Sequence, residues 1–429
     1  MSTHYQANAE PFASANRCPY TGLGQEFYPF MSPYLDNPYP FFARARSEEP
    51  VFYNPDLDCW VISRYEDIKT ILRDPATFSA DIVTTPLQPF SADVLHMLRE
   101  GGYRSTPVLS NTDPPAHTRM RQSVALAFTP RRVAVLEPYI RQLVQAHIDR
   151  FIQEGRADLV HQFTYDIPAL VMFRLLGIPD EDVPVVKMGA EHRLLLMWGK
   201  PAPAEQARLA RGLVAFWQYS VGLVAQRLRQ PQDDLTSDLI RVRNGDDTVL
   251  TVPEIESMVF SLLMAGHEPT TNLLSNGLRQ LLAHWEVWQT LCQHPARIPN
   301  AVEELLRFDT SAVAWHRRTT RPVDLGGVGI PAGARLLLLL GSANHDEAHF
   351  PAPERLDIYR ANAKEHLSFG FGIHYCLGAP LAKLEMHIAL ELLTTRLPGM
   401  RLVESQAFEF LPNTTVRGPQ HLWVEWDVA

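Results

Sequence analysis

One short segment near the C-terminus, Phe369–Gly378 (FGFGIHYCLG), contains the residue best suited to bind a transition metal, Cys376. A thiolate stays a metal ligand only where hydrogen bonds and positive charge keep it deprotonated. The glycines at positions 370, 372 and 378 allow backbone N–H groups to approach the sulfur, and the helix expected after Cys376 points its positive end at the same atom. A lone cysteine is more often a buried structural thiol, but the length of this flanking pattern favours an iron ligand.

The segment resembles the haem-thiolate loop of cytochrome P-450 monooxygenases, which reads Phe, two residues, Gly, three residues, Cys, one residue, Gly. The resemblance implies that Cys376 is the axial ligand of haem b, iron protoporphyrin IX, and that electron donation from its sulfur favours O–O cleavage. It also implies that Phe369 and Gly370 contact the cofactor. The implied fold is mostly α with small β-sheets, with haem between a long central helix and the helix that follows Cys376.

Two carboxylates of haem need cations or hydrogen-bond donors when they are buried. The resemblance assigns this task to His117 and Arg121, which share one face of a predicted helix, and to Arg317 and His374. Because Arg318 follows directly, the haem contact could be either Arg317 or Arg318. Each of these residues alone is also explained as a surface cation, whereas the four in this order favour a haem site.

A long helix is predicted from Val252 to about His284, because Thr251 and Glu254 have capping-box form and apolar residues then recur at helical spacing. About 33 residues at about 1.5 Å each give a length of roughly 50 Å, enough to cross a domain. Further helices are predicted at about 299–308 and from just after Cys376 to about Leu397. The long helix is therefore expected to be the central one.

Within this helix, Met264–Thr271 (MAGHEPTT) resembles the family's oxygen-activating motif, in which an acid and an alcohol deliver protons. The small side chain of Ala265 lets a helix pass close over a flat cofactor. Pro269 stands where the family usually has its threonine, and it has no N–H to give the carbonyl of Ala265. We hypothesise that Glu268 is the proton gate and that Thr270 or an ordered water supplies the alcohol. The alternative is a kinked core helix with Glu268 in a salt bridge.

A carboxylate and a guanidinium, Glu304 and Arg307, lie one turn apart about seventy residues before the cysteine loop. Such a pair is usually solvated. Together with Arg355, however, it resembles the family's Glu–Arg–Arg network beneath the haem. We expect these three residues to stabilise the fold and to take no part in the chemistry.

The substrate pocket implied by the resemblance includes Ser261, Met264 and Ala265 on the long helix. It also includes Ala312, Val313 and Phe90. Each of these is equally well explained as ordinary core. A mainly apolar lining favours a small apolar or aromatic organic substrate. Residues 180–206, rich in Leu, Met, Trp and Pro, are expected to form a mobile lid.

The 429 residues carry a net charge of −9, which gives no support to nucleic-acid binding. The four cysteines, at positions 18, 59, 292 and 376, are far apart, which disfavours a disulfide framework or zinc site and fits a reducing cytoplasm. No apolar stretch predicts a membrane anchor. Prolines are spread evenly and no linker is seen, so we expect a single domain, residues 1–429. Short strands are predicted at 51–53, 59–63, 326–340 and near 408–424.

The segments Cys18–Gly22 (CPYTG) and Met264–Asn272 resemble the haem domain of self-sufficient bacterial members, which carry a fused flavin and iron–sulfur reductase. No reductase domain is expected within this chain, because it has too few cysteines for a plant-type cluster and no Gly-x-Gly-x-x-Gly fingerprint. Electrons from NAD(P)H are then expected from such a reductase domain or from a separate ferredoxin. Four cations could form a docking face for this electron donor, or they could simply be solvated, and the two interpretations are equally good. They are Arg119, Arg131, Arg132 and Lys383.

The resemblance thus predicts a bacterial haem-thiolate monooxygenase that inserts one atom of O2 into a small organic substrate by hydroxylation, dealkylation or sulfoxidation. One alternative is a peroxygenase on the same scaffold that uses hydrogen peroxide directly, which the unusual Pro269 motivates. A second is a non-catalytic haem-binding sensor. The presence of both an acid and an alcohol over the iron argues against the sensor.

Overall fold

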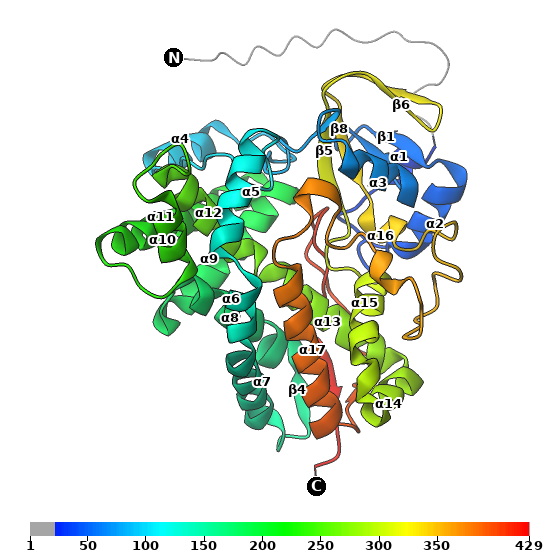
Figure 1. Cartoon of the computed structure of the whole chain (residues 1–429). Coiled ribbons are helices and arrows are strands. Elements are labelled where there is room, and N and C mark those ends of the chain that lie inside the picture. The colour runs from blue at the N-terminus through cyan, green and yellow to red at the C-terminus, as the bar shows by residue number, and fades with distance from the viewer. Residues whose placement is uncertain (1–21, 429) are drawn as a thin grey trace.

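The computed structural model describes residues 22–428, and helices make up most of this part of the chain (Figure 1). Cys18 and the start of the CPYTG segment lie outside the described residues. Among residues 22–428, no helix is both long and apolar enough to cross a membrane. The α-helices are α1 Leu23–Glu26, α2 Tyr39–Glu48, α3 Tyr65–Arg73, α4 Ala92–Glu100, α5 Ala116–Ala127, α6 Pro130–Val135, α7 Glu137–Phe151, α8 Asp166–Leu176, α9 Val183–Trp198, α10 Pro203–Arg229, α11 Leu235–Arg243, α12 Val252–Ala265, α13 Glu268–Ala283, α14 Trp285–Gln293, α15 Ile298–Phe308, α16 Leu340–Ala343 and α17 Ala379–Arg396.

The strands form three small sheets: in Figure 1, β1, β5, β6 and β8 lie together at the upper right, whereas β4 lies at the lower centre between α7 and α17. The largest sheet has the order β1-β2-β8-β5-β3, in which only β2 and β8 run parallel. A three-stranded sheet has the order β4-β10-β9, and β6 and β7 form a hairpin. The strands are β1 Val51–Asn54, β2 Cys59–Ile62, β3 Phe78–Ser79, β4 Arg156–Asp158, β5 Trp315–Thr319, β6 Val323–Leu325, β7 Val328–Ile330, β8 Arg335–Leu338, β9 Arg401–Leu402 and β10 Trp423–Glu425.

The predicted central helix begins as expected but is not continuous. Thr251 Oγ1 accepts from the N–H of Glu254 at 3.2 Å, and a Glu254 carboxylate oxygen accepts from the N–H of Thr251 at 2.8 Å, so the capping box is formed. The helix stops at Ala265, and a second helix starts at Glu268. The prediction of one helix from 252 to 284 was therefore wrong at this point, because Pro269 in the first turn of α13 has no N–H for the carbonyl four residues back.

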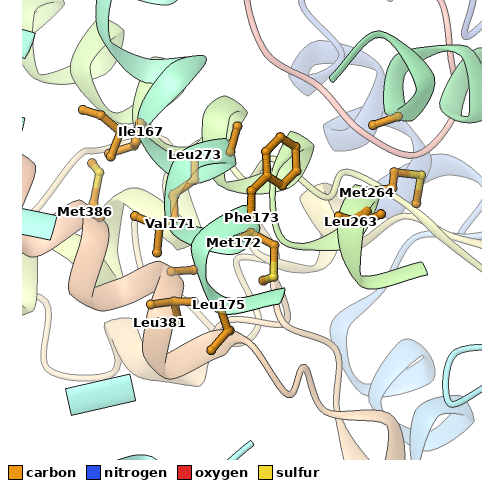
Figure 2. Close-up of a cluster of buried hydrophobic side chains, with 14 of the residues drawn as sticks. Ile167, Val171, Met172, Phe173, Leu175, Leu263, Met264, Leu273, Leu381 and Met386 are labelled. Carbon is orange, nitrogen blue, oxygen red and sulfur yellow. The ribbon is translucent and has the colours of Figure 1, made fainter. Parts of the chain in front are cut away.

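Four helices share the core that surrounds this break (Figure 2). Each buried Leu, Met or Phe side chain there contributes roughly 2–3 kcal/mol relative to its exposure to water. This packing holds α12 and α13 in place relative to α17. The side chains that Figure 2 labels are Ile167, Val171, Met172, Phe173 and Leu175 from α8, Leu263 and Met264 from α12, Leu273 from α13, and Leu381 and Met386 from α17.

The buried ion-pair network contains Arg360 and not the predicted Arg355. Glu304 accepts two hydrogen bonds of 2.8 Å from Arg307 and two of 3.1 Å from the Nε of Arg360. Arg355 is exposed and contributes only its carbonyl, which accepts from both guanidinium groups. The expectation was wrong because the chain turns after Ala352, and the carbonyls of Pro351 and Ala352 then point at Arg360.

Candidate active site

A cavity of about 300 Å³ lies between the α12–α13 break and the segment around Cys376. Its walls are mainly apolar, which suits a flat organic cofactor and a small organic ligand. The lining residues come from the segment before α5, from α5, α12 and α13, from β5 and its approach, and from the cysteine loop and α17. They include Leu109, Arg121, Val124, Met258, Ser261, Leu262, Ala265, Gly266, Pro269, Thr270, Ala312, Trp315, Arg317, Phe369, Gly370, His374, Cys376 and Glu385.

The loop that presents Cys376 depends on two glycines in the left-handed region. Gly370 has φ +69° and Gly372 has φ +70°, angles that other residues adopt at a cost. A Cβ at Gly372 would also lie 2.6 Å from the carbonyl oxygen of Leu72. The N–H of Cys376 then donates to the carbonyl of Phe369 at 2.9 Å, which closes the loop. These contacts turn the cysteine side chain into the cavity.

Opposing effects act on the thiol of Cys376. Its depth in the protein raises the pKa of the thiol, whereas the backbone N–H groups of Gly378 and Ala379 and the guanidinium of Arg121 lower it. The N-terminus of α17 supplies those N–H groups, as the sequence predicted. A bound metal cation would favour the thiolate further, because a coordinated thiol loses its proton.

Three of the four predicted haem-carboxylate contacts, Arg121, Arg317 and His374, line the cavity, and His117 lies directly behind His374. The ring centres of His117 and His374 are 4.3 Å apart, and the buried Nε2 atom of each has no hydrogen-bond partner among the described residues. Arg317 is 2% exposed and donates to the carbonyl of His316, and Arg121 donates to the carbonyl of Tyr375. Burial lowers the pKa of Arg317 to about 10. These buried cations and open nitrogens form a site for buried negative charge.

The opposite wall is the groove at the helix break. Ala265, Pro269 and Thr270 line the cavity, and the hydroxyl of Thr270 accepts and donates no hydrogen bond among the described residues. Glu268 points away from the cavity lining, toward α8 and α9. Its Oε1 lies 3.7 Å from Nδ1 of His267 and has no hydrogen-bond partner in residues 22–428.

Electrostatics keep Glu268 protonated near neutral pH. Burial raises the pKa of its carboxyl to about 8, the charge of Glu191 adds to this shift, and the charge of Lys187 opposes it. Lys187 itself donates to Asp166 at 2.6 Å. Burial lowers the pKa of His267 to about 3, so this imidazole is neutral. A carboxyl with a pKa near the working pH is suited to pass protons.

Comparisons with known proteins decide the family. A sequence profile described as Cytochrome P-450 matches residues 297–397. The chain is 35% identical over 413 residues to the cytochrome P-450 monooxygenase PikC of Streptomyces venezuelae, and the alignment covers 94% of this chain and 93% of PikC.

The chain belongs to the cytochrome P-450 family.

Two solved structures of this cytochrome P-450 family match over nearly the whole fold. Full-length CYP116B46 from Tepidiphilus thermophilus superposes with a TM-score of 0.92 at 40% identity, over 94% of this chain and 54% of that chain. This chain thus spans about half the length of that relative. Cytochrome P-450 CREJ in complex with (4-ethylphenyl) dihydrogen phosphate superposes with a TM-score of 0.91 at 40% identity, over 94% of this chain and 100% of that one.

Membership of the cytochrome P-450 family confirms the predicted fold, the enzyme class and haem b as the cofactor. The cavity fits that cofactor on grounds of its own. It has a cysteine on one wall and small residues and a helix break on another. At its edge lie the imidazoles of His117 and His374, whose Nε2 atoms have no hydrogen-bond partner among the described residues, beside the buried Arg317, which feels the charge of Asp113 but forms no ion pair within residues 22–428.

Some of the other predicted site residues of this cytochrome P-450 line the cavity, and others do not. Phe369 and Gly370 line the cavity, as do Ser261, Ala265 and Ala312. Met264, Val313 and Phe90 are not part of its lining. On α12 the lining residues Met258, Ser261, Leu262 and Ala265 follow the i, i+3, i+4, i+7 spacing of one helix face, and Met264 lies off that face.

Sequence reasoning missed several lining residues. The spacing on α12 would have revealed Met258 and Leu262. The sequence does not show that the segments of Leu109, Trp315 and Glu385 face the cavity. The predicted lid, residues 180–206, comprises α9 and the start of α10, and Arg193 of α9 donates to the carbonyl of Phe260 on α12.

Proposed function

We propose that the protein inserts one atom of O2 into a small, mainly apolar or aromatic substrate, with electrons that a redox partner passes on from NAD(P)H. The observation that carries this proposal is the pairing of Cys376 on one cavity wall with Ala265 and Thr270 on the other. When bound, haem supplies the iron at which O2 is activated. We assign the residues that follow to its binding and to proton delivery.

The haem is held, on this proposal, by Cys376 as the axial ligand and by His117, Arg121, Arg317 and His374 around its carboxylates. Two observations on the described residues support this assignment: the Nε2 atoms of the two histidines have no hydrogen-bond partner, and the buried Arg317 forms no ion pair, although the charge of Asp113 acts on it. Phe369 and Gly370 cover the sulfur side. Their task is to keep water from the thiolate and to fix the sulfur's position.

We propose that Glu268 takes up protons on the α8–α9 side and that Thr270 holds a hydrogen-bonded position inside the cavity. Support comes from the pKa of Glu268, raised to about 8, and from its neighbours Lys187 and Glu191. Thr270 is the first hydroxyl after Pro269 and lines the cavity. An ordered water in contact with Thr270 would connect the two residues.

The substrate is proposed to lie against Ser261, Ala265 and Ala312, with Trp315 as a further aromatic wall. Met264, Val313 and Phe90 are left out of the proposed contacts. Relatives act on varied molecules: one is named a 6-deoxyerythronolide B hydroxylase, and CREJ was solved with an ethylphenyl phosphate. Haem would fill part of the cavity of about 300 Å³, and the space that it leaves favours a compact molecule of the second kind.

We further propose that residues 1–429 are one haem-thiolate domain and that a flavin/iron–sulfur reductase domain or a separate ferredoxin donates its electrons. The match to about half of full-length CYP116B46 supports a donor of this type. Three of the four cations suggested for docking already pair with carboxylates: Arg119 with Glu254, Arg132 with Asp233 and Lys383 with Glu303. We therefore propose no docking face there. The unpaired Cys59, Cys292 and Cys376 support a reducing, cytoplasmic location.

The visible spectrum of the reduced, carbon-monoxide-bound protein tests the haem assignment. Wild type is expected to show the thiolate-type band, and Cys376→Ser is expected to lose it. Retention of that band in the variant would overturn the assignment. Oxygenated product from NAD(P)H, O2 and a reductase would then establish the reaction.

Peroxide-driven turnover is the second candidate, because Pro269 removes the usual hydroxyl next to Ala265. Product formed with hydrogen peroxide but none with any reductase and O2 would favour it. In that case Pro269→Thr is expected to reduce peroxide-driven turnover and to raise O2-driven turnover. The opposite result, or no change, would remove Pro269 as the cause.

A further inference from the structure

Arg193 of α9 is a buried cation that forms no ion pair with a carboxylate in the described part of the chain. It is 5% exposed, donates to the carbonyl of Phe260 at 3.1 Å, and lies 4.2 Å from the centre of the Phe260 ring. Burial lowers the pKa of its guanidinium, and no carboxylate among residues 22–428 acts on it in return. A buried charge of this kind is costly unless a counter-charge arrives.

The other buried arginines in the described part of the chain have an explanation. Arg46, Arg227, Arg307 and Arg360 each form an ion pair with a carboxylate. Arg417 feels the charge of Asp309, and Arg317 lies at the proposed haem carboxylates. Arg193 is left as a cation for which neither the fold nor the cofactor supplies an anion.

The guanidinium of Arg193 reaches the cavity through one hydroxyl. Its Nη2 donates to Ser261 Oγ at 3.4 Å, and Ser261 lines the cavity one helical turn before Ala265. A guanidinium can only donate hydrogen bonds, so the oxygen of Ser261 is the acceptor. The hydroxyl hydrogen of Ser261 is therefore free to donate to a ligand, with a positive charge directly behind it.

The remaining charges of the cavity do not offset Arg193. Glu385 is the carboxyl in the lining, and burial raises its pKa well above the ordinary value, so it is neutral. Arg121 and Arg317 lie on the side of the haem carboxylates. The described lining residues thus bring no ionised carboxylate to the α9–α12 end of the cavity to offset the charge of Arg193.

We propose that Ser261 and Arg193 recognise the oxyanion head of the substrate. The proposed substrate class is a compact apolar or aromatic body with a carboxylate or a phosphate monoester, its head at Ser261 and its body extending toward Ala265. This inference rests on the proposed function, since it concerns the same cavity. Arg193 acts here as a specificity-determining residue and has no part in proton delivery.

Equilibrium dialysis and spin-state titration with matched probes test the proposal. The probes are 4-ethylphenyl phosphate, 4-ethylbenzoate and the uncharged 4-ethylbenzamide, and the protein is the full haem-loaded chain. Wild type is expected to bind at least one of the anions about tenfold or more tightly than the amide, the size typical of a charge-assisted hydrogen bond. The two anions show which head group fits.

Four variants locate the effect. Arg193→Met is expected to remove the preference for anions with little change for the amide, and Arg193→Lys to restore part of it. Ser261→Ala is expected to reduce the preference as well. Arg211→Met, at an exposed arginine of α10, is the control and is expected to leave all three affinities unchanged.

Equal binding of anions and amide by wild type would overturn the proposal, as would an unchanged preference in Arg193→Met. If Arg193→Met fails to fold, wild type and Ser261→Ala decide: a wild-type preference that Ser261→Ala does not reduce also overturns it. Absence of the thiolate-type band from the wild-type spectrum would contradict the proposed function itself. A protein with that band and no anion preference fails only this inference.

Discussion

Glu304 and Arg307 face each other one turn apart on α15 through two hydrogen bonds of 2.8 Å, and neither side chain is exposed to solvent. Arg360 donates to the same carboxylate from the following loop. The guanidinium groups of Arg307 and Arg360 also bind backbone carbonyls of residues 344–355. The network therefore ties α15 to the chain that leads to the cysteine loop.

Replacing Arg360 and replacing Arg355 should have very different effects on stability. Arg360→Ala leaves a buried carboxylate with one partner fewer, and should lower the free energy of unfolding by about 3 kcal/mol or more. Arg355→Ala removes an exposed side chain and should change it by less than about 0.5 kcal/mol. Urea unfolding measures both. Equal losses of unfolding free energy in the two variants would show that the Arg355 side chain stabilises the fold through contacts outside this network.

The two glycines of the cysteine loop allow a matched comparison. Gly370→Ala and Gly372→Ala each force a side chain into the left-handed region, at about 1 kcal/mol. At position 372 the new Cβ would lie 2.6 Å from the backbone oxygen of Leu72, a clash, whereas at position 370 the nearest atom is the backbone oxygen of His374 at 3.9 Å, an ordinary contact. Gly372→Ala should thus cost at least about 1 kcal/mol more in unfolding free energy. It should also lower haem content, and similar results for both variants would exclude the contact with Leu72 as the cause.

Thr270→Ala should release a severalfold larger share of the consumed NAD(P)H electrons as hydrogen peroxide, because the cavity loses its hydroxyl at the helix break. Thr271→Ala is the control, since Thr271 is buried and does not line the cavity. Peroxide release and product are measured per NAD(P)H. Unchanged coupling in Thr270→Ala would assign the alcohol function to a water alone.

Glu268 should make stability depend on pH. Its pKa of about 8 in the folded protein lies above the ordinary 4.5. The folded protein keeps this proton where the unfolded chain has lost it, so stability falls as the pH rises from about 4.5 to about 8. Glu268→Gln removes this dependence, and its stability relative to wild type should rise by about 1 kcal/mol per pH unit in that range. Urea unfolding at pH 5.5 and 8 measures the difference, with the exposed Glu404→Gln as a control.

The sequence predicted the parts of the site that depend on local pattern. The cysteine loop, the capping box at Thr251 and the helix after Cys376 follow from nearest neighbours along the chain, and the structure contains all three. The strands predicted at 51–53 and 59–63 are present as β1 and β2, and the predicted strand region 326–340 contains β7 and β8.

Features that depend on distant parts of the chain were predicted less well. Arg355 and Arg360 have the same chemistry, and only the turn at Ala352 decides which one meets Glu304. Met264 was assigned to the pocket by its position next to Ala265, but one residue along a helix rotates a side chain by about 100°. Arg193 had no motif around it, and its relation to Ser261 exists only because α9 crosses α12.

The two helices on either side of the break, α12 and α13, pack on largely different neighbouring helices. α12 packs on α9, α10 and α11, and α13 packs on α14, α15 and α17, whereas α8 packs on both halves. Because the hydrogen-bonded ladder of the helix is interrupted at Gly266 and His267, the packing of both halves on α8 sets their relative orientation. The cavity wall at the break thus depends on side chains far away in the sequence, whereas the wall at Cys376 is held by hydrogen bonds within its own loop.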